Sequence, residues 1–182
     1  MDYPKRLARE WYEYQGYFVR RAVRVGLTTD GRHPCELSLV AFHPLLRHVV
    51  QIEPYASREP SELHDAYFRT KFDAGKTYLH RLFGTSPPLH VEQIALVDCR
   101  FSPSQETIGG GRVVRLEDLI SQILKAIAPL EAGGEPVREQ WPLIRTLQLI
   151  SLLDPLPIIE RLNRSAETSP TPQYDPRSAD DS

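Results

Sequence analysis

The sequence predicts a single α/β domain in which one sheet is flanked by helices. Two apolar strands joined by a short turn at Pro44–Arg47 span the central stretch Glu36–Ser57. Helical periodicity precedes that stretch at Tyr3–Gln15 and returns after Pro60. The chain has 182 residues, of which 41% are apolar and 25% charged, so it is long enough to bury one core.

The composition excludes several classes of protein. No apolar run is long enough to span a membrane, and the first ten residues do not read as a secretion signal. Cys35 and Cys99 do not make a disulfide framework, and no zinc-type spacing of cysteine and histidine occurs. We therefore expect a cytoplasmic protein without a membrane partner. The net charge of −2 does not by itself indicate nucleic-acid binding, although a local basic patch matters more than the sum.

The N-terminal part predicts a helix followed by a strand. Aromatic and leucine residues recur at helical spacing over Tyr3–Gln15, and Gly16 ends that helix. The segment Tyr17–Val25 alternates and is rich in β-branched and aromatic residues, which is typical of a strand. Its arginines give both faces positive charge, so we expect an edge strand or a ligand-facing one. A loop with an Asp30–Gly31 turn follows.

The two central strands carry acids at their ends. Alternation places these residues on one face of each strand: Glu36, Ser38, Val40 and Phe42 in the first, and Gln51, Glu53 and Tyr55 in the second. Antiparallel pairing would bring Glu36 and Glu53 side by side, as in a divalent-metal site. The alternative is that both acids lie in solvent where the strands fray.

The remaining elements follow from the same patterns. We expect a long helix from Ser61 to Gly84, a strand at Leu89–Cys99, a flexible loop at Arg100–Arg112, a helix at Leu116–Leu130, a hinge at Gly133–Gly134 and a helix at Val137–Leu153 bent near Pro142. The chain from residue 164 onward has almost no apolar residues and predicts disorder. These elements divide into a core over residues 1–100, packed C-terminal helices over 101–163, and a tail over 164–182.

Four short pieces of the core resemble a known superfamily. They are Gly16-Tyr17-Phe18-Val19, the strand beginning Cys35-Glu36-Leu37-Ser38, the strand end Ile52-Glu53-Pro54-Tyr55, and Lys71-Phe72-Asp73-Ala74-Gly75-Lys76 in the following helix. Their order over Leu7–Cys99 resembles the PD-(D/E)XK nucleases, and among them an uncharacterised bacterial branch. The resemblance implies a restriction-endonuclease-like fold, with a central mixed sheet of about four strands.

The resemblance also implies a metal-dependent nuclease site. In that family a helix acid and two strand acids hold Mg²⁺ or Mn²⁺ at the scissile phosphate, and a lysine orients the attacking water. Carried over, Glu10 (or Glu13) is the helix acid and Glu53 the strand acid. The metal-binding aspartate is replaced by Ser38 and the lysine by Tyr55, so the site is degenerate. Ser38 remains at the metal position, although a hydroxyl is a poor ligand for a hard dication.

Two substitutions would rebuild the site. Glu36 lies one pleat from Ser38 and would supply the second acid, and Lys71 or Lys76 from the next helix would supply the ammonium. The sequence therefore leaves three functions open: a nucleic-acid-associated protein with weakened or lost nuclease activity, an active Mg²⁺- or Mn²⁺-dependent DNA endonuclease, or a protein-interaction module such as a homodimer.

A basic groove is the predicted nucleic-acid interface. It would be formed by Arg20, Arg24, Arg32, Arg58 and Arg69. The alternative is that these arginines are solvated and offset by scattered acids. DNA is the partner that the resemblance implies. A dimer would instead follow if the apolar stripe of Leu116–Leu130, or the last helix, stayed exposed.

Overall fold

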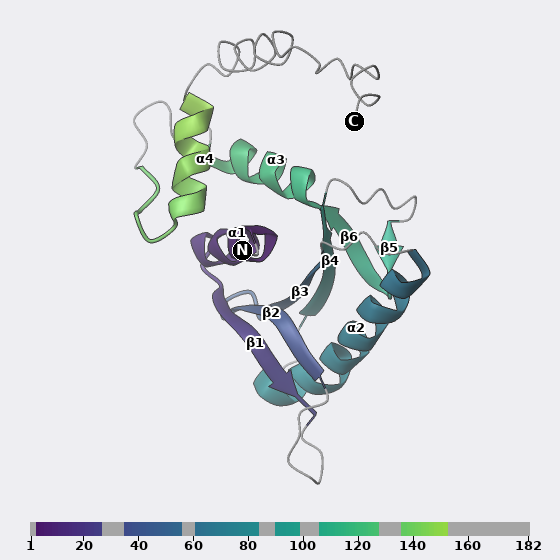
Figure 1. Ribbon diagram of the computed structural model, residues 1–182. Coiled ribbons are helices and arrows are strands. Elements are labelled where there is room, and N and C mark those ends of the chain that lie inside the picture. The colour runs from purple at the N-terminus through teal and green to yellow at the C-terminus, as the bar shows by residue number, and fades with distance from the viewer. Residues whose placement is uncertain are drawn as a thin grey trace, which may run out of the picture.

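The computed structural model describes residues 3–26, 35–55, 61–83, 90–98, 106–127 and 136–152, with the side chains of 61–64 and 152 excepted. In this part of the chain the protein is a mixed α/β structure with four helices and one mixed sheet of six strands (Figure 1). The elements in chain order are α1 (Tyr3–Tyr14), β1 (Phe18–Val25), β2 (Cys35–His43), β3 (His48–Tyr55), α2 (Ser61–Phe83), β4 (His90–Val97), β5 (Thr107–Ile108), β6 (Gly111–Arg115), α3 (Leu116–Ile127) and α4 (Pro142–Leu152).

The sheet has an antiparallel half and a parallel half. Its strand order is β1-β2-β3-β4-β6-β5. Strands β1, β2 and β3 form an antiparallel meander, and α2 then crosses over so that β4 runs parallel to β3. Strand β6 runs parallel to β4, and the two residues of β5 close the edge against β6. A parallel pair needs such a crossover connection, which a helix usually supplies.

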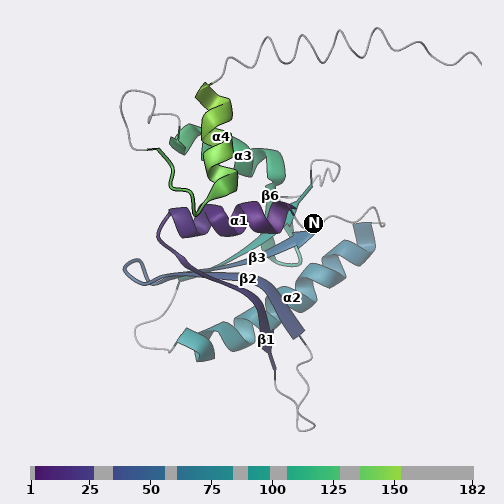
Figure 2. The same ribbon diagram turned by 60° about the vertical axis from the view of Figure 1, so that its left-hand side comes forward.

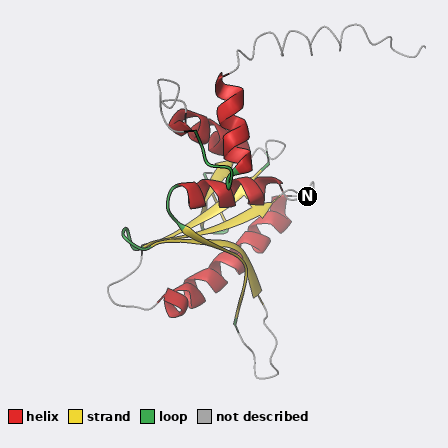
Figure 3. Cartoon of the chain, turned by 90° about the vertical axis from the view of Figure 1, so that its left-hand side faces the viewer, coloured by secondary structure: helices red, strands yellow, loops and turns green. Residues whose placement is uncertain are grey.

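Helices cover both faces of the sheet, as an edge-on view shows (Figure 3). Helices α1, α3 and α4 lie on one face, where they share an apolar cluster with β2, β3 and β4. Leu7, Leu39 and Ile123 are fully buried members of that cluster. Helix α2 lies alone on the other face, over two smaller clusters that include Phe68, Phe72 and Leu79.

Most predicted elements are confirmed, and two are wrong. The sheet has six strands rather than about four, because the predicted loop at Arg100–Arg112 contains β5 and the start of β6. Gly109 and Gly110 form the turn between them with φ of 58° and 85°, values that glycine adopts without steric cost. The last helix begins at Pro142 instead of bending there, which suits proline because its missing N–H has no helical partner at that position.

Several predictions lie outside the described residues. They are the Asp30–Gly31 turn, the Gly133–Gly134 hinge, and the tail at 164–182. None of the described helices is long and apolar enough to cross a membrane. The predicted apolar stripe of α3 is buried, since Leu119, Ile123 and Ile127 pack in the cluster with α1 and α4.

Helix α2 approaches the sheet most closely at Gly75. A Cβ atom placed there would lie 1.8 Å from Gln51 Oε1 and 3.0 Å from Gln93 Nε2. The amide of Gln51 donates to the Lys71 carbonyl (3.0 Å), and the amide of Gln93 donates to the Phe72 carbonyl (2.7 Å). Two side chains of the sheet therefore reach the backbone of the helix, and only glycine leaves room for them.

Replacing Gly75 by alanine tests this contact. Alanine normally stabilises a helix interior by about 1 kcal/mol relative to glycine. Here the added methyl group collides with Gln51, so we expect Gly75→Ala to lower the free energy of unfolding by about 1–3 kcal/mol. Urea denaturation gives the value, and Lys76→Ala, at the next and exposed position, is the control. A stabilised Gly75→Ala protein would contradict the close approach.

Candidate functional site where β2 and β3 diverge

The sheet divides between β2 and β3. Their register runs from His43–His48 to Leu39–Ile52 and stops there. Beyond that point β2 stays paired with β1, and β3 stays paired with β4 as far as Tyr55–Val97. Figure 2 shows β1 and β2 curving away from β3 over α2. The divergence leaves backbone groups of β2 without a strand partner, and a side chain takes the place of that partner.

Glu53 fills the gap between the strands. Its carboxylate accepts the Ser38 backbone N–H, at 3.1 Å to Oε1 and 3.2 Å to Oε2. The Gln51 amide also donates to Oε1, at 3.0 Å. Glu53 is fully buried, and Gln51 is buried with it. The acid predicted from the sequence is thus held inside the protein by the Ser38 N–H and the Gln51 amide and is not a frayed strand end.

Two residues of α2 complete the surroundings of this carboxylate. The Ser38 side chain hydrogen-bonds both Glu53 and Tyr67. In both cases the contact with Ser38 lowers the pKa of the partner group. The Lys71 ammonium donates to the Glu36 carbonyl, lies 5.7 Å from the centre of the Tyr67 ring, and acts electrostatically on Glu53. Tyr67 and Lys71 are four residues apart and so share one face of the helix.

Burial controls the protonation of these groups. It raises the pKa of Glu53 above the ordinary value, and the hydrogen bonds from Gln51 and Ser38 and the charge of Lys71 oppose that rise. Burial also raises the pKa of Tyr67, and the Glu53 carboxylate adds to the effect. A carboxyl group whose pKa is raised in this way can hold or release a proton closer to neutral pH than an exposed glutamate.

The described residues do not fit a bound Mg²⁺ or Mn²⁺. Glu36 was expected to lie beside Glu53, but its carboxylate is half exposed and faces Arg24, 3.8 Å away on β1. No group of three acidic, histidine or cysteine side chains gathers anywhere in the described ranges. A hard dication needs several oxygen ligands, and the hydroxyl of Ser38 is already engaged by Glu53 and Tyr67.

The structure places Glu10 away from this site. Glu10 lies on α1, across the sheet from α2, and is fully buried. Its Oε2 accepts the backbone N–H groups of Leu143 (2.6 Å) and Ile144 (3.4 Å) at the start of α4. Arg6 donates to Oε1 at 3.3 Å. Glu10 therefore satisfies free N–H groups of a helix N-terminus, and Glu13 pairs with Arg9 (3.4 Å).

The predicted arginines are only partly brought together. Arg20 and Arg24 are exposed on β1, at register positions opposite Val40 and Glu36. Arg69 lies on α2 and is held by Asp65, with 2.8 Å between its Nη2 and Oδ2. Arg32 and Arg58 lie outside the described residues.

Sequence reasoning missed the polar residues that support Glu53. Alternation places Gln51 on the face of Glu53 but indicates no partner for it, and the sequence patterns indicate no role for Tyr67 or Gln93. Gln93 donates to Gln51 Oε1 at 2.8 Å, so Gln51 is oriented from both sides. One signal was available for Gln51 and Gln93, since a glutamine inside an otherwise apolar strand needs a partner. Tyr55, at the position where the sequence resemblance implies a lysine, has its ring centre 5.2 Å from that of Tyr67.

The buried carboxylate of Glu53 predicts a pH dependence of stability. A folded-state pKa above the unfolded value means that the folded protein binds the extra proton, so stability falls as pH rises from the ordinary glutamate pKa through the raised one. We expect Glu53→Gln to remove this loss, so the variant gains stability relative to the wild type as the pH rises above the ordinary glutamate pKa of about 4. Urea unfolding at each pH measures it, with the half-exposed Glu36→Gln as control. Parallel curves for Glu53→Gln and the wild type would exclude Glu53 as the source.

The contact of Glu10 with α4 predicts a structural effect. Glu10→Ala leaves two N–H groups of α4 without their acceptor, and we expect the free energy of unfolding to fall by about 1–3 kcal/mol. Glu10→Gln keeps one acceptor oxygen and should lose less. Glu13→Ala, on the same helix but only in an ion pair with Arg9, is the control for chemical denaturation. Equal losses in Glu10→Ala and Glu13→Ala would contradict the capping role.

Comparison with known proteins does not place the chain in a family. No protein-family model matches the sequence, and neither the curated proteins nor the solved structures contain a significant match.

Proposed function

We propose that this protein is a nucleic-acid-binding relative of the PD-(D/E)XK nucleases whose metal site has degenerated, so that it binds phosphodiesters without hydrolysing them efficiently. The proposal joins the arrangement of the core, the contacts of Glu53 and the exposed arginines of β1.

The order of elements supports the restriction-endonuclease-like fold. A helix leads into three antiparallel strands, a second helix crosses over, and a fourth strand runs parallel to the third. The resemblance of the sequence implies that same order. Strands β5 and β6 and helices α3 and α4 are additions beyond this core.

The observation that carries the proposal is the meeting of Ser38 and Glu53 where β2 and β3 diverge, with Lys71 beside them. These are the two strand positions at which the resemblance implies metal ligands. Protein donors now occupy the oxygen atoms of Glu53, and an ammonium from α2 supplies the nearby positive charge. Cationic groups also stabilise a bound phosphate, so binding of nucleic acid would outlast the loss of the metal.

Two exposed arginines lead from the edge of the sheet toward this site. Arg20 and Arg24 are both exposed on β1, the edge strand, and lie on opposite faces of it, because Ala22 between them has a φ of 52° and Val23 faces the same groove as Arg20. Arg24 is next to Glu36. Arginine binds phosphate oxygens through its planar fork of donors. A strand of nucleic acid along β1 would therefore meet positive charge before it reached Lys71.

Binding and cleavage assays with labelled DNA test the proposal. We expect an affinity in the micromolar range that weakens as salt rises, because phosphate contacts dominate it, and binding that persists in EDTA, because no metal is needed. Arg20→Ala and Arg24→Ala should each lower the slope of log affinity against log salt by about 0.7–0.9. Fluorescence anisotropy measures both. Arg145→Ala is the matched control, because Arg145 lies on α4 and pairs with Glu139.

The same samples separate the proposal from its rivals. Nicking of a plasmid that needs Mn²⁺ or Mg²⁺ and disappears in Glu53→Gln would show an active nuclease with a rebuilt site. No binding even at low salt would reject a nucleic-acid partner, and a protein-interaction module would then remain.

A further inference from the structure

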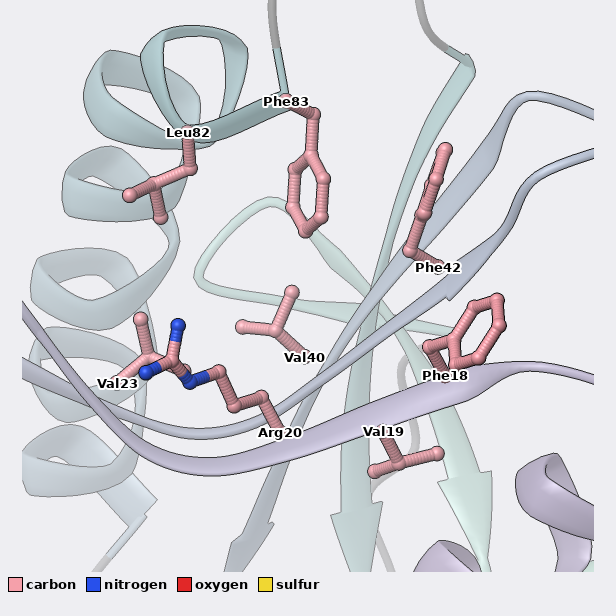
Figure 4. A pocket seen from close by; sticks show the side chains of 8 residues that line it. All are labelled: Phe18, Val19, Arg20, Val23, Val40, Phe42, Leu82 and Phe83. Carbon is pink, nitrogen blue, oxygen red and sulfur yellow. The ribbon is translucent and has the colours of Figure 1, made fainter.

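A groove lies beside β1, on the sheet face that α2 only partly covers (Figure 4). Its volume is about 330 Å³. Phe18 and Phe42 come from neighbouring register positions of β1 and β2, Val40 forms the floor, and Leu82 and Phe83 close it from the end of α2. Apart from Arg20 its lining is apolar, which leaves one charged group at an otherwise hydrophobic opening.

Phe18 is the most unusual residue of this groove. Its side chain is 72% exposed, whereas Phe42 and Phe83 stack on each other with ring centres 4.8 Å apart. Burial contributes little to folding stability for a ring that is largely exposed. An exposed aromatic ring at the edge of an apolar groove is instead typical of a binding surface. No described residue stacks on Phe18, and its neighbour Arg20 has no carboxylate partner within the described ranges.

An exposed ring beside an unpaired arginine matches the chemistry of single-stranded nucleic acid. Unpaired bases stack on aromatic side chains, whichever the base, while arginines hold the adjoining phosphates. A duplex keeps its bases stacked and paired, so it cannot offer a base face to Phe18. The volume of the groove is at the small end of the range for ligand pockets. It can therefore hold a single ring system, such as one base, but not an extended ligand.

Strand β1 leads from the groove toward the Glu53 site. Phe18 and Arg20 face the groove, whereas Arg24 lies on the opposite face beyond Ala22, whose φ is 52°, and pairs with the Glu36 carboxylate near Lys71. We propose that β1 guides a single strand of nucleic acid, with an unpaired base stacked on Phe18 at the groove and the adjoining phosphate at Arg20. This inference rests on the proposed function and names its substrate class as single-stranded.

Charge argues for this occupant over a second copy of the chain. Pairing of two β1 strands across an edge would bring the arginines of one strand against those of the other, and like charges placed directly opposite are unfavourable. The phosphate backbone of a nucleic acid would instead supply an anionic partner for Arg20.

The test compares a fluorescein-labelled oligothymidylate with a duplex of the same length. We expect the wild type to bind the single strand about tenfold more tightly than the duplex. Phe18→Ala should weaken single-strand binding about tenfold and leave duplex binding and the salt slope unchanged, because stacking involves no counterion release. Phe18→Trp should restore the affinity, and quenching of its added fluorescence by the single strand would report direct stacking. Arg20→Ala should lower the salt slope by about 0.7.

The outcomes separate the two proposals. Equal affinity for both probes, with Phe18→Ala unchanged, would overturn the single-strand assignment and leave nucleic-acid binding standing. It would also favour an apolar side chain of another protein as the occupant of the groove. Failure to bind either probe at low salt would overturn the proposed function itself. Phe18→Ala is expected to fold, because the ring is largely exposed, and its melting temperature checks this.

Discussion

The contact between α2 and the sheet depends on two glutamines. Gln93 donates to Gln51 and to the Phe72 carbonyl, and Gln51 donates to Glu53 and to the Lys71 carbonyl. Buried polar groups are tolerated only when they are hydrogen-bonded. The two amides can reach their partners only when α2 has one particular placement along the sheet. This network therefore specifies where Tyr67 and Lys71 stand relative to Ser38, which apolar packing alone would specify less sharply.

The same network explains how a carboxylate persists in the interior. A buried acid without donors would be strongly unfavourable, and Glu53 has the Ser38 N–H, the Ser38 hydroxyl, the Gln51 amide and the charge of Lys71. These partners are groups of the protein itself. Lys71 adds positive charge at the point where the sheet opens.

Local patterns predicted most of the fold, and long-range contacts decided the rest. The strong apolar stripe over Leu116–Ile127 predicted α3 because helical spacing is a local property. The two residues of β5 carry too little pattern to be recognised as a strand. Glu53 could be picked out as an acid in an apolar strand, but the partner of Glu10 lies 133 residues away, on α4, so no spacing in the sequence indicates it. The predicted pairing of Glu36 with Glu53 is wrong for a related reason, because the Glu36 carboxylate faces Arg24 on β1.

The division of the sheet also has a consequence for the order of folding. The meander β1–β3 closes only short loops, whereas β3 can pair with β4 only after α2 has been formed and carried across. Helix α2 covers Glu53, since Gln51 donates both to that carboxylate and to the Lys71 carbonyl. The raised pKa of Glu53 therefore depends on the packing of α2 against the sheet, and we expect acidic conditions to favour that packing.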